Sequence, residues 1–175
     1  IVALTNSSQA LSKAAFQQLN AVQNIKKNQI SSYFAERLGD VSVLAGNPTV
    51  VSAMADFEAA YENDGNRVDG PTWRMAESMY ADWLVQYKEE YGYYDLFLIA
   101  IDGDVVYTVA KESDLGENLA NGSLSSSPLG KCYKQSRSDI ALADFEPYAP
   151  SNNEPCGFVG APVRKEGKII GIAAL

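Results

Sequence analysis

The sequence predicts an α+β fold, in which a long N-terminal helix and shorter helices pack on a five-stranded antiparallel sheet. Three observations support this prediction. Apolar residues recur at helical spacing through residues 1–92, and strand-like apolar runs dominate residues 93–175. The third is Asp102-Gly103, which lies between two β-branched runs and is a strong signal for a β-hairpin.

The first predicted element is a long helix. Apolar residues follow a helical period from Leu11 to Leu44, and the polar residues 5–8 are suitable N-terminal caps. A continuous helix of this length measures about 60 Å at about 1.5 Å per residue. Because one small sheet cannot cover such a length, the early part is expected to project from the domain. The alternative is a helical hairpin broken near Gly39.

The remaining elements follow from local signals. Asn47-Pro48 and Pro71 each open a shorter helix, and Gly92 ends the second of these. The run from Leu96 to Ile101 is apolar at every position, which is typical of a strand covered on both faces. Strands are expected at residues 96–101, 105–109, 140–146, 156–163 and 168–175, with a short helix at 128–137 and a loop at 147–155.

Composition excludes several functional classes. The net charge of −8 argues against nucleic acid and anionic membrane surfaces, which select basic patches. No apolar run approaches the length of a membrane span. The chain contains no histidine, so it cannot form a Ser-His-Asp or Cys-His site and lacks the commonest transition-metal ligand. Neither a catalytic site nor a metal site nor a cofactor is therefore expected.

The two cysteines leave two interpretations open. Cys132 and Cys156 are too few for a zinc cluster and lack C-x-x-C spacing. They are expected to form a disulfide, which implies an oxidising compartment. The alternative is a pair of buried thiols.

Three stretches resemble a known family. They are YDLFLIAIDGDVVYTVAKESDLGENL at residues 94–119, DFEPYAPS at 144–151 and FVGAPVRKEGKIIGIAAL at 158–175. Together they resemble a Cache domain, the PAS-like extracytoplasmic sensor domain of bacterial chemoreceptors, histidine kinases and cyclases. The resemblance covers residues 93–175 well and the helical first half only as a pattern.

The resemblance implies a setting and an architecture. Residues 1–92 would form the helical stalk and packing helices, and residues 93–175 the PAS-like sensor unit, together making one extracytoplasmic domain. It would be the periplasmic part of an inner-membrane receptor, anchored by segments outside this sequence, and would dimerise through the long N-terminal helix. The ends, Ile1-Val2-Ala3-Leu4 and the strand-like run 169–175, are consistent with a piece excised from such a receptor.

A ligand pocket is expected between the sheet and the segment 112–137, bounded by the loop at 147–155. Polar and aromatic residues converge there, as is usual in small-molecule sites. Each also has a purely structural explanation: a strand cap for Asp95, a core aromatic for Tyr107, a solvated cation for Lys111 and turn chemistry for Asp144 and Tyr148. The expected ligand-binding residues are Asp95, Tyr107, Lys111, Tyr133, Asp144, Tyr148 and Phe158.

Three functions follow from this reading. The leading one is the sensing of a small polar metabolite, a carboxylate or an amino acid, by a transmembrane receptor, with a chemoreceptor as the first expectation. The second is a ligand-free dimerisation or protein-docking domain of a sensor kinase or cyclase. The third, an enzyme using Asp95 and Asp144 as acid and base, is disfavoured by the missing histidine and the lack of a phosphate-binding Gly loop.

Overall fold

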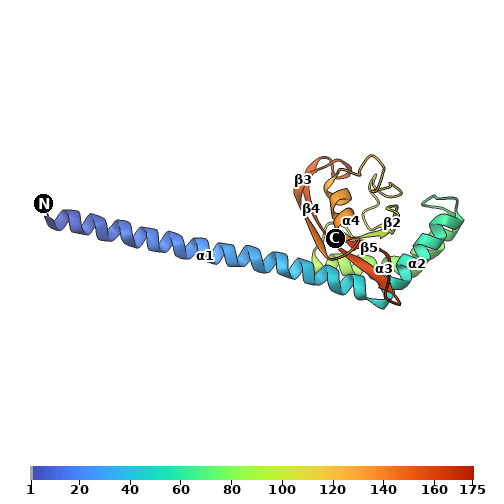
Figure 1. Ribbon diagram of the computed structural model, residues 1–175, viewed down its shortest axis with the longest axis horizontal. Helices are drawn as coiled ribbons and strands as arrows, with labels where there is room; N and C mark the ends of the chain where they lie inside the picture. The colour runs from blue at the N-terminus through green and yellow to red at the C-terminus, as the bar shows by residue number, and fades with distance from the viewer. Residues whose placement is uncertain (1) are drawn as a thin grey trace. The chain divides into compact units, whose positions relative to one another are not determined.

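The computed structural model describes the backbone of residues 2–175 and the side chains from residue 9 onward. Contacts divide the chain into two compact units, Ile1–Arg37 and Leu38–Leu175, and all of the sheet lies in the second. The helices are α1 (Val2–Gly46), α2 (Pro48–Asn63), α3 (Pro71–Tyr91) and α4 (Pro128–Ser136) (Figure 1). The strands are β1 (Phe97–Ala100), β2 (Val105–Thr108), β3 (Ala141–Tyr148), β4 (Glu154–Lys165) and β5 (Lys168–Ala174), with a short 3-10 turn at Ala149–Ser151.

Helix α1 corrects two details of the sequence prediction. It begins at Val2, so residues 5–8, which were expected to precede it, lie inside its backbone range. It also continues through Gly39, which rules out the broken hairpin. A helix-interior glycine costs only about 1 kcal/mol relative to alanine. Burial of Val41 and Leu44 just beyond Gly39 offsets this cost.

Helices α2 and α3 are capped by different means. Asn47 caps α2 as expected, because its Oδ1 accepts a hydrogen bond from the Thr49 N–H at 2.8 Å. Helix α3 begins after Gly70, which has no side chain to act as a cap, and Asp64 takes this role from the end of α2. Its Oδ2 accepts the Trp73 N–H at 2.8 Å. A Cβ at position 70 would overlap the Asp64 carboxylate, so this capping requires glycine.

The five strands form one antiparallel sheet in the order β2-β1-β5-β4-β3, which confirms the predicted α+β fold. Strands β3 and β4 are longer than expected, because Pro147 and Pro155 are paired residues of the two strands and the predicted loop shrinks to residues 149–153. Proline has no N–H to donate but is tolerated where a strand is an edge. Pro147 lies on the edge strand β3, and Pro155 lies on β4 before residues 160–165, the part that pairs with β5.

Two apolar cores lie on opposite faces of the sheet. On one face, called here the α2–α3 face, the largest buried side chains include Phe57, Trp73, Leu98 and Tyr107. On the other, called here the α4 face, they include Phe97, Ile99, Leu129, Tyr133, Tyr148 and Phe158. Strand β1 contributes alternately to both cores and is buried at every position, as its uninterrupted apolar run predicts.

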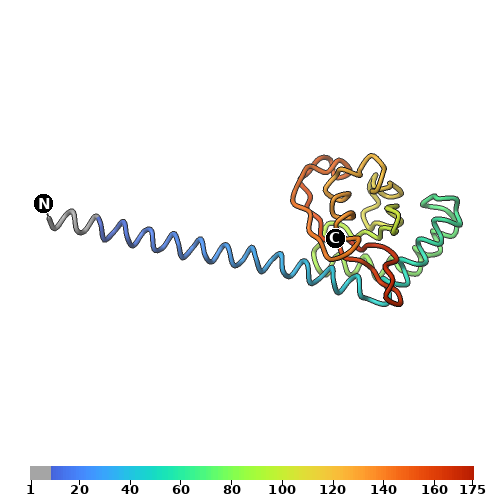
Figure 2. Tube along the Cα trace, in the orientation of Figure 1, coloured from blue at the N-terminus to red at the C-terminus, as the bar shows by residue number. Residues whose placement is uncertain are grey.

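The segment between β2 and α4, residues 109–127, contains neither helix nor strand (Figure 2). It is nevertheless held firmly to the β1–β2 hairpin by backbone hydrogen bonds. The Gly116 N–H donates to the Val105 carbonyl at 2.9 Å, the Val105 N–H donates to the Glu117 carbonyl at 2.9 Å, and the Leu119 N–H donates to the Gly103 carbonyl at 2.8 Å. The segment therefore extends the α4 face beyond the edge of the sheet.

The expected disulfide is not formed, and both cysteines are free. The Cys132 thiol packs beneath Gly160 of β4, where an added Cβ would come within 2.9 Å of its sulfur. Cys156 lies four residues before Gly160 on the same strand. At about 3.3 Å per residue, it is about 13 Å from Gly160, against which the Cys132 thiol packs. Disulfide bonds need Cα atoms within about 7 Å. Burial also raises the pKa of the Cys132 thiol to about 11.

Candidate functional site

The α4 face contains one buried carboxylate that is only half satisfied. Asp114, in the irregular segment after β2, is fully buried. Its Oδ2 accepts a hydrogen bond from the Tyr148 hydroxyl at 2.7 Å, and Tyr148 lies at the end of β3. Its Oδ1 receives no hydrogen bond from any described residue. Buried polar atoms nearly always have a partner, so this oxygen needs an explanation.

Aromatic rings extend from this carboxylate across the sheet. The Tyr148 ring meets Phe158 of β4 edge-on, with centroids 5.0 Å apart. Phe158 in turn meets Phe97 of β1 at 5.9 Å, again edge-on. Asp114, Tyr148, Phe158 and Phe97 are called the Asp114 site below. It combines an apolar aromatic wall with one charged group, which is the usual composition of a small-molecule site.

The charge state of this site is set by burial. The pKa of Asp114 is raised to about 6, mainly by burial and also by the carboxylates of Asp95 and Glu112, while the hydrogen bond from Tyr148 and the backbone N–H of Asp114 itself act in the opposite direction. The pKa of Tyr148 is raised as well, first by burial and then by the charge of Asp114. Tyr148 therefore remains a neutral donor, and Asp114 titrates close to neutral pH.

The carboxylate of Asp95, an expected ligand residue, is hydrogen-bonded to other groups of the protein. Its carboxylate accepts the backbone N–H groups of Leu96 at 2.7 Å and Ala110 at 2.9 Å, and the Thr108 hydroxyl. These bonds close the end of the β1–β2 ladder. Burial raises the pKa of Asp95 and the hydrogen bonds oppose it. The arrangement corresponds to the strand-capping explanation considered from the sequence.

A second carboxylate lies at the outer side of the site. Glu112 accepts hydrogen bonds from the Tyr94 hydroxyl at 2.6 Å and from the Ser151 hydroxyl at 2.8 Å. It thereby ties the segment after β2 to the chain before β1 and to the turn after β3. Among the residues that the structure describes, no lysine or arginine forms an ion pair with Asp95, Glu112 or Asp114. The region is acidic and lacks an internal counter-charge.

The structure separates the remaining expected ligand residues into two groups. Tyr133, Tyr148 and Phe158 lie together on the α4 face. The Tyr133 hydroxyl donates to the Ile101 carbonyl at 2.9 Å, so Tyr133 fastens α4 to the β1–β2 turn. Asp144 is exposed and accepts the N–H of Phe145 at 2.8 Å.

Two expected ligand residues lie on the other side of the sheet. Tyr107 packs on the α2–α3 face against Phe57, with ring centroids 4.6 Å apart. Lys111 forms an ion pair with Glu77 and lies 5.9 Å from the Trp73 ring centroid. The structure therefore does not bring these two residues to the Asp114 site.

Sequence reasoning did not select Asp114. It lies in an irregular segment, where no periodicity indicates which side chains point inward. Its partner Tyr148 and the Ser151 that contacts Glu112 both fall within the loop that was expected to bound the pocket. The expected region was therefore the one in which these groups meet, but the charged group that distinguishes it was not identified.

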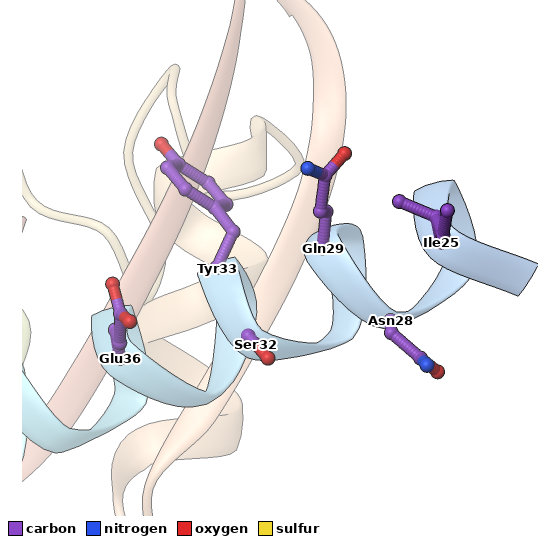
Figure 3. Close-up of a pocket in the computed structure, with 6 residues that line it drawn as sticks. All are labelled: Ile25, Asn28, Gln29, Ser32, Tyr33 and Glu36. Atoms are coloured by element: carbon purple, nitrogen blue, oxygen red, sulfur yellow. The ribbon is translucent and has the colours of Figure 1, made fainter. Parts of the chain in front are cut away.

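A shallow hollow lies on α1, within the unit Ile1–Arg37, and is lined by one helix only (Figure 3). Ile25, Gln29 and Tyr33 project from one side of the helix, and Asn28 projects from another. A hollow lined by about three turns of a single helix does not enclose a ligand. It belongs to the exposed surface of α1, on which several large apolar side chains are open to solvent.

No group of three or more His, Cys, Asp or Glu side chains within the described residues is placed to hold a metal ion. None of the described helices combines the length and hydrophobicity needed to span a bilayer.

Comparison with known proteins identifies the fold. No family model matches the sequence, and no curated protein matches it. Among solved structures, the sensor domain of the histidine kinase DctB from V. cholerae aligns with a TM-score of 0.59 and 15% identity, over 91% of this chain and 55% of that chain. An extracellular ligand-binding receptor from Desulfohalobium retbaense aligns with a TM-score of 0.41 and 15% identity, over 77% of this chain and 24% of that chain.

This chain spans about half the length of the DctB sensor domain. The alignment nevertheless includes 91% of this chain. The chain therefore shares its fold with the part of the DctB sensor domain that it covers, in agreement with the resemblance found in its sequence.

Proposed function

We propose that this chain is the extracytoplasmic small-molecule-sensing domain of a transmembrane signal-transduction receptor. It would face the periplasm, carry no catalytic activity of its own, and be anchored by segments outside this sequence. A sensor kinase is favoured over a chemoreceptor, because the structural neighbour with the higher TM-score is the sensor domain of a kinase. This revises the preference for a chemoreceptor that the sequence alone suggested.

The observation that supports sensing is the unsatisfied Oδ1 of Asp114. A purely structural carboxylate at this depth would be expected to have all its acceptors satisfied, as Asp95 does nearby. An unpaired buried acceptor instead costs about 1–3 kcal/mol, and a ligand that donates a hydrogen bond to it recovers this free energy. The aromatic wall next to it supplies apolar contact.

Thermal-shift screening of the isolated chain against small polar metabolites tests this proposal, with calorimetric titration of any compound that raises the melting temperature. A ligand present at about a hundredfold its dissociation constant adds about 2.7 kcal/mol to the free energy of unfolding. The Asp114→Ala variant should lose binding, since it removes the unpaired acceptor. Asp144→Ala is the comparison, because Asp144 was an expected ligand residue but is exposed. Binding that depends on Asp144 and not on Asp114 would place the site elsewhere.

A second candidate function is dimerisation or protein docking without a ligand. It is favoured by the apolar side chains exposed along α1, of which Leu11, Phe16, Leu19 and Ile25 are each more than half exposed. An exposed apolar stripe on a helix is typical of an interface with another helix. The two functions are compatible, because dimerisation concerns α1 and sensing concerns the α4 face.

A further inference from the structure

We infer that the Asp114 site binds a small organic cation, through an ammonium group that donates a hydrogen bond to Asp114 Oδ1. This inference rests on the proposed sensing function and assigns its ligand a chemical class. It narrows the sequence-based expectation of a carboxylate or an amino acid. Three independent features of the described residues support it: the unpaired acceptor, the sign of the surrounding charge and the aromatic wall.

The hydrogen-bonding pattern requires a donor. Asp114 Oδ2 already has one donor in the Tyr148 hydroxyl, at 2.7 Å, and Oδ1 has none. An ionised carboxylate only accepts, so the missing partner must carry an N–H or O–H group. Because the Tyr148 hydroxyl uses its hydrogen on Asp114, its oxygen is left able to accept a second hydrogen bond. An alkylammonium group has three N–H donors and can donate to Asp114 Oδ1 and to the Tyr148 hydroxyl oxygen at once.

The surrounding charge selects a cation. The negative charges of Asp95 and Glu112 disfavour the ionised form of Asp114, as expected for like charges. Lys111 immediately precedes Glu112 in the chain, yet its ammonium is directed to Glu77 and Trp73 on the α2–α3 face. Two other lysines near α4 are also engaged, Lys131 with Glu146 and Lys134 with the Ser125 carbonyl. A ligand carboxylate would thus enter an acidic region without a positive partner.

The aromatic wall distinguishes an organic cation from a metal ion. The described residues contain no group of three or more ligating side chains suited to a metal. Tyr148, which binds the carboxylate, packs on Phe158, and Phe158 packs on Phe97. Aromatic faces attract alkylammonium groups and also contact their methylene groups, whereas a metal ion prefers several oxygen ligands. A short amine satisfies both the carboxylate and the rings.

Access to the site involves the segment 109–127, because Asp114 belongs to this segment and is fully buried. This segment contains neither helix nor strand, and Glu112 ties it to Tyr94 and Ser151 through exposed or partly buried hydrogen bonds. Such bonds open at lower cost than those of a packed core. Loosening of the contacts of Glu112 is therefore the local opening through which a ligand reaches Asp114.

Matched compounds of equal chain length provide the test. Short linear diamines, with 1,4-diaminobutane as the first probe, are compared by thermal shift and calorimetry with the diol, the dicarboxylate and the amino acid of the same length. The diamines should raise the melting temperature, while butane-1,4-diol and succinate should not. The amino acid 4-aminobutyrate should bind more weakly than the diamine, because its carboxylate meets Asp95 and Glu112.

Two variants and a pH series complete the experiment. Asp114→Asn keeps the volume but removes the charge, and should weaken diamine binding by at least about tenfold, the equivalent of about 1.4 kcal/mol. Asp144→Asn, which changes an exposed carboxylate, should leave the affinity unchanged. Since the pKa of Asp114 is about 6, diamine affinity should fall as the pH is lowered through that value. In Asp114→Asn this dependence should be much reduced.

The outcomes separate the inference from the proposed function. A carboxylate or diol that binds while the amines do not would overturn the cation assignment and leave the sensing function intact. Amine binding that is equally strong in Asp114→Asn would overturn the assignment of the site. If neither these compounds nor the broader metabolite panel stabilise the protein, a bound water is the partner of Oδ1, and both the inference and the sensing function are wrong.

Discussion

Two tyrosines show how single residues decide the site. From the sequence, Tyr107 and Tyr148 are equivalent candidates for a pocket wall, yet they lie on opposite faces of the sheet. The pairing of β1 with β2 shifts register between Leu98 and Ile99, so that Val106 and Tyr107 both join the α2–α3 core. A bulge of this kind reverses which side chains face a given core. No local signal in the sequence places it.

The charge of Asp114 gives a prediction at the same scale. Its pKa rises from 3.8 to about 6 on folding, so the folded protein binds a proton between about pH 4 and pH 6 that the unfolded chain has released. The free energy of unfolding contributed by this group is therefore larger at low pH and is lost as the pH rises through 6. Asp114→Asn should flatten the pH dependence of stability over this window, measured by urea denaturation.

The control for this measurement is Asp144→Asn, which alters an exposed carboxylate. Asp95 also has a raised pKa and contributes a slope of the same sign. The informative quantity is therefore the difference between wild type and variant. Parallel slopes for wild type and Asp114→Asn would show that Asp114 is ionised throughout, and that its burial is less complete in solution.

At the scale of elements, most of the fold follows from local sequence, because its signals are local. Proline after a capping residue starts α2 and α4, and a left-handed Gly92 ends α3. The turn between β4 and β5 has positive φ at Glu166 and Gly167, as expected for a tight hairpin. The cap of α3 could not be anticipated, because Asp64 supplies it from another element and only the folded chain brings the two together.

Helix α4 packs closely on the sheet at Gly160 of β4, and this contact allows a prediction. A Cβ at Gly160 would lie 2.5 Å from the Ser136 hydroxyl and 2.9 Å from the Cys132 sulfur. Gly160→Ala should therefore push α4 outward and lower the free energy of unfolding by about 1–3 kcal/mol, the usual cost of overpacking. Chemical denaturation measures the change.

A second substitution identifies the cause. Ser136→Gly removes the side chain that the new methyl group would overlap, so the double variant should recover part of the loss beyond additivity. Gly39→Ala is the matched control, since a Cβ there meets no atom within 4 Å and should stabilise α1 slightly. Equal effects of Gly160→Ala with and without Ser136 would contradict the close approach of α4.

At the scale of the whole molecule, the exposed face of α1 predicts self-association. Val22 and Ile25 are 49% and 56% exposed, which is unusual for adjacent members of one apolar stripe. Val22→Glu or Ile25→Glu should weaken a dimer formed through this stripe and leave the sheet folded, because neither side chain belongs to a core. Sedimentation velocity over a range of concentrations measures association, and near-ultraviolet circular dichroism reports the folded sheet.

Asn20→Glu introduces the same charge on the opposite side of α1 and should not change association. A wild-type chain that sediments as a monomer at every concentration would count against an α1 interface. Loss of the near-ultraviolet signal in Ile25→Glu would instead show that α1 contributes to the stability of the sheet.

The hydroxyl groups of Tyr87 and Tyr93 both donate to Asp40, the first to its backbone carbonyl at 2.9 Å and the second to its carboxylate at 2.8 Å. Tyr93 stands two residues before Asp95, whose carboxylate closes the ladder beside the Asp114 site. The Tyr93 side chain therefore contacts α1 at Asp40 and lies shortly before the first residue of β1. A fluorine atom on Tyr93 would therefore give an NMR resonance whose shift, on addition of ligand, records whether occupancy of the α4 face is felt at the helix.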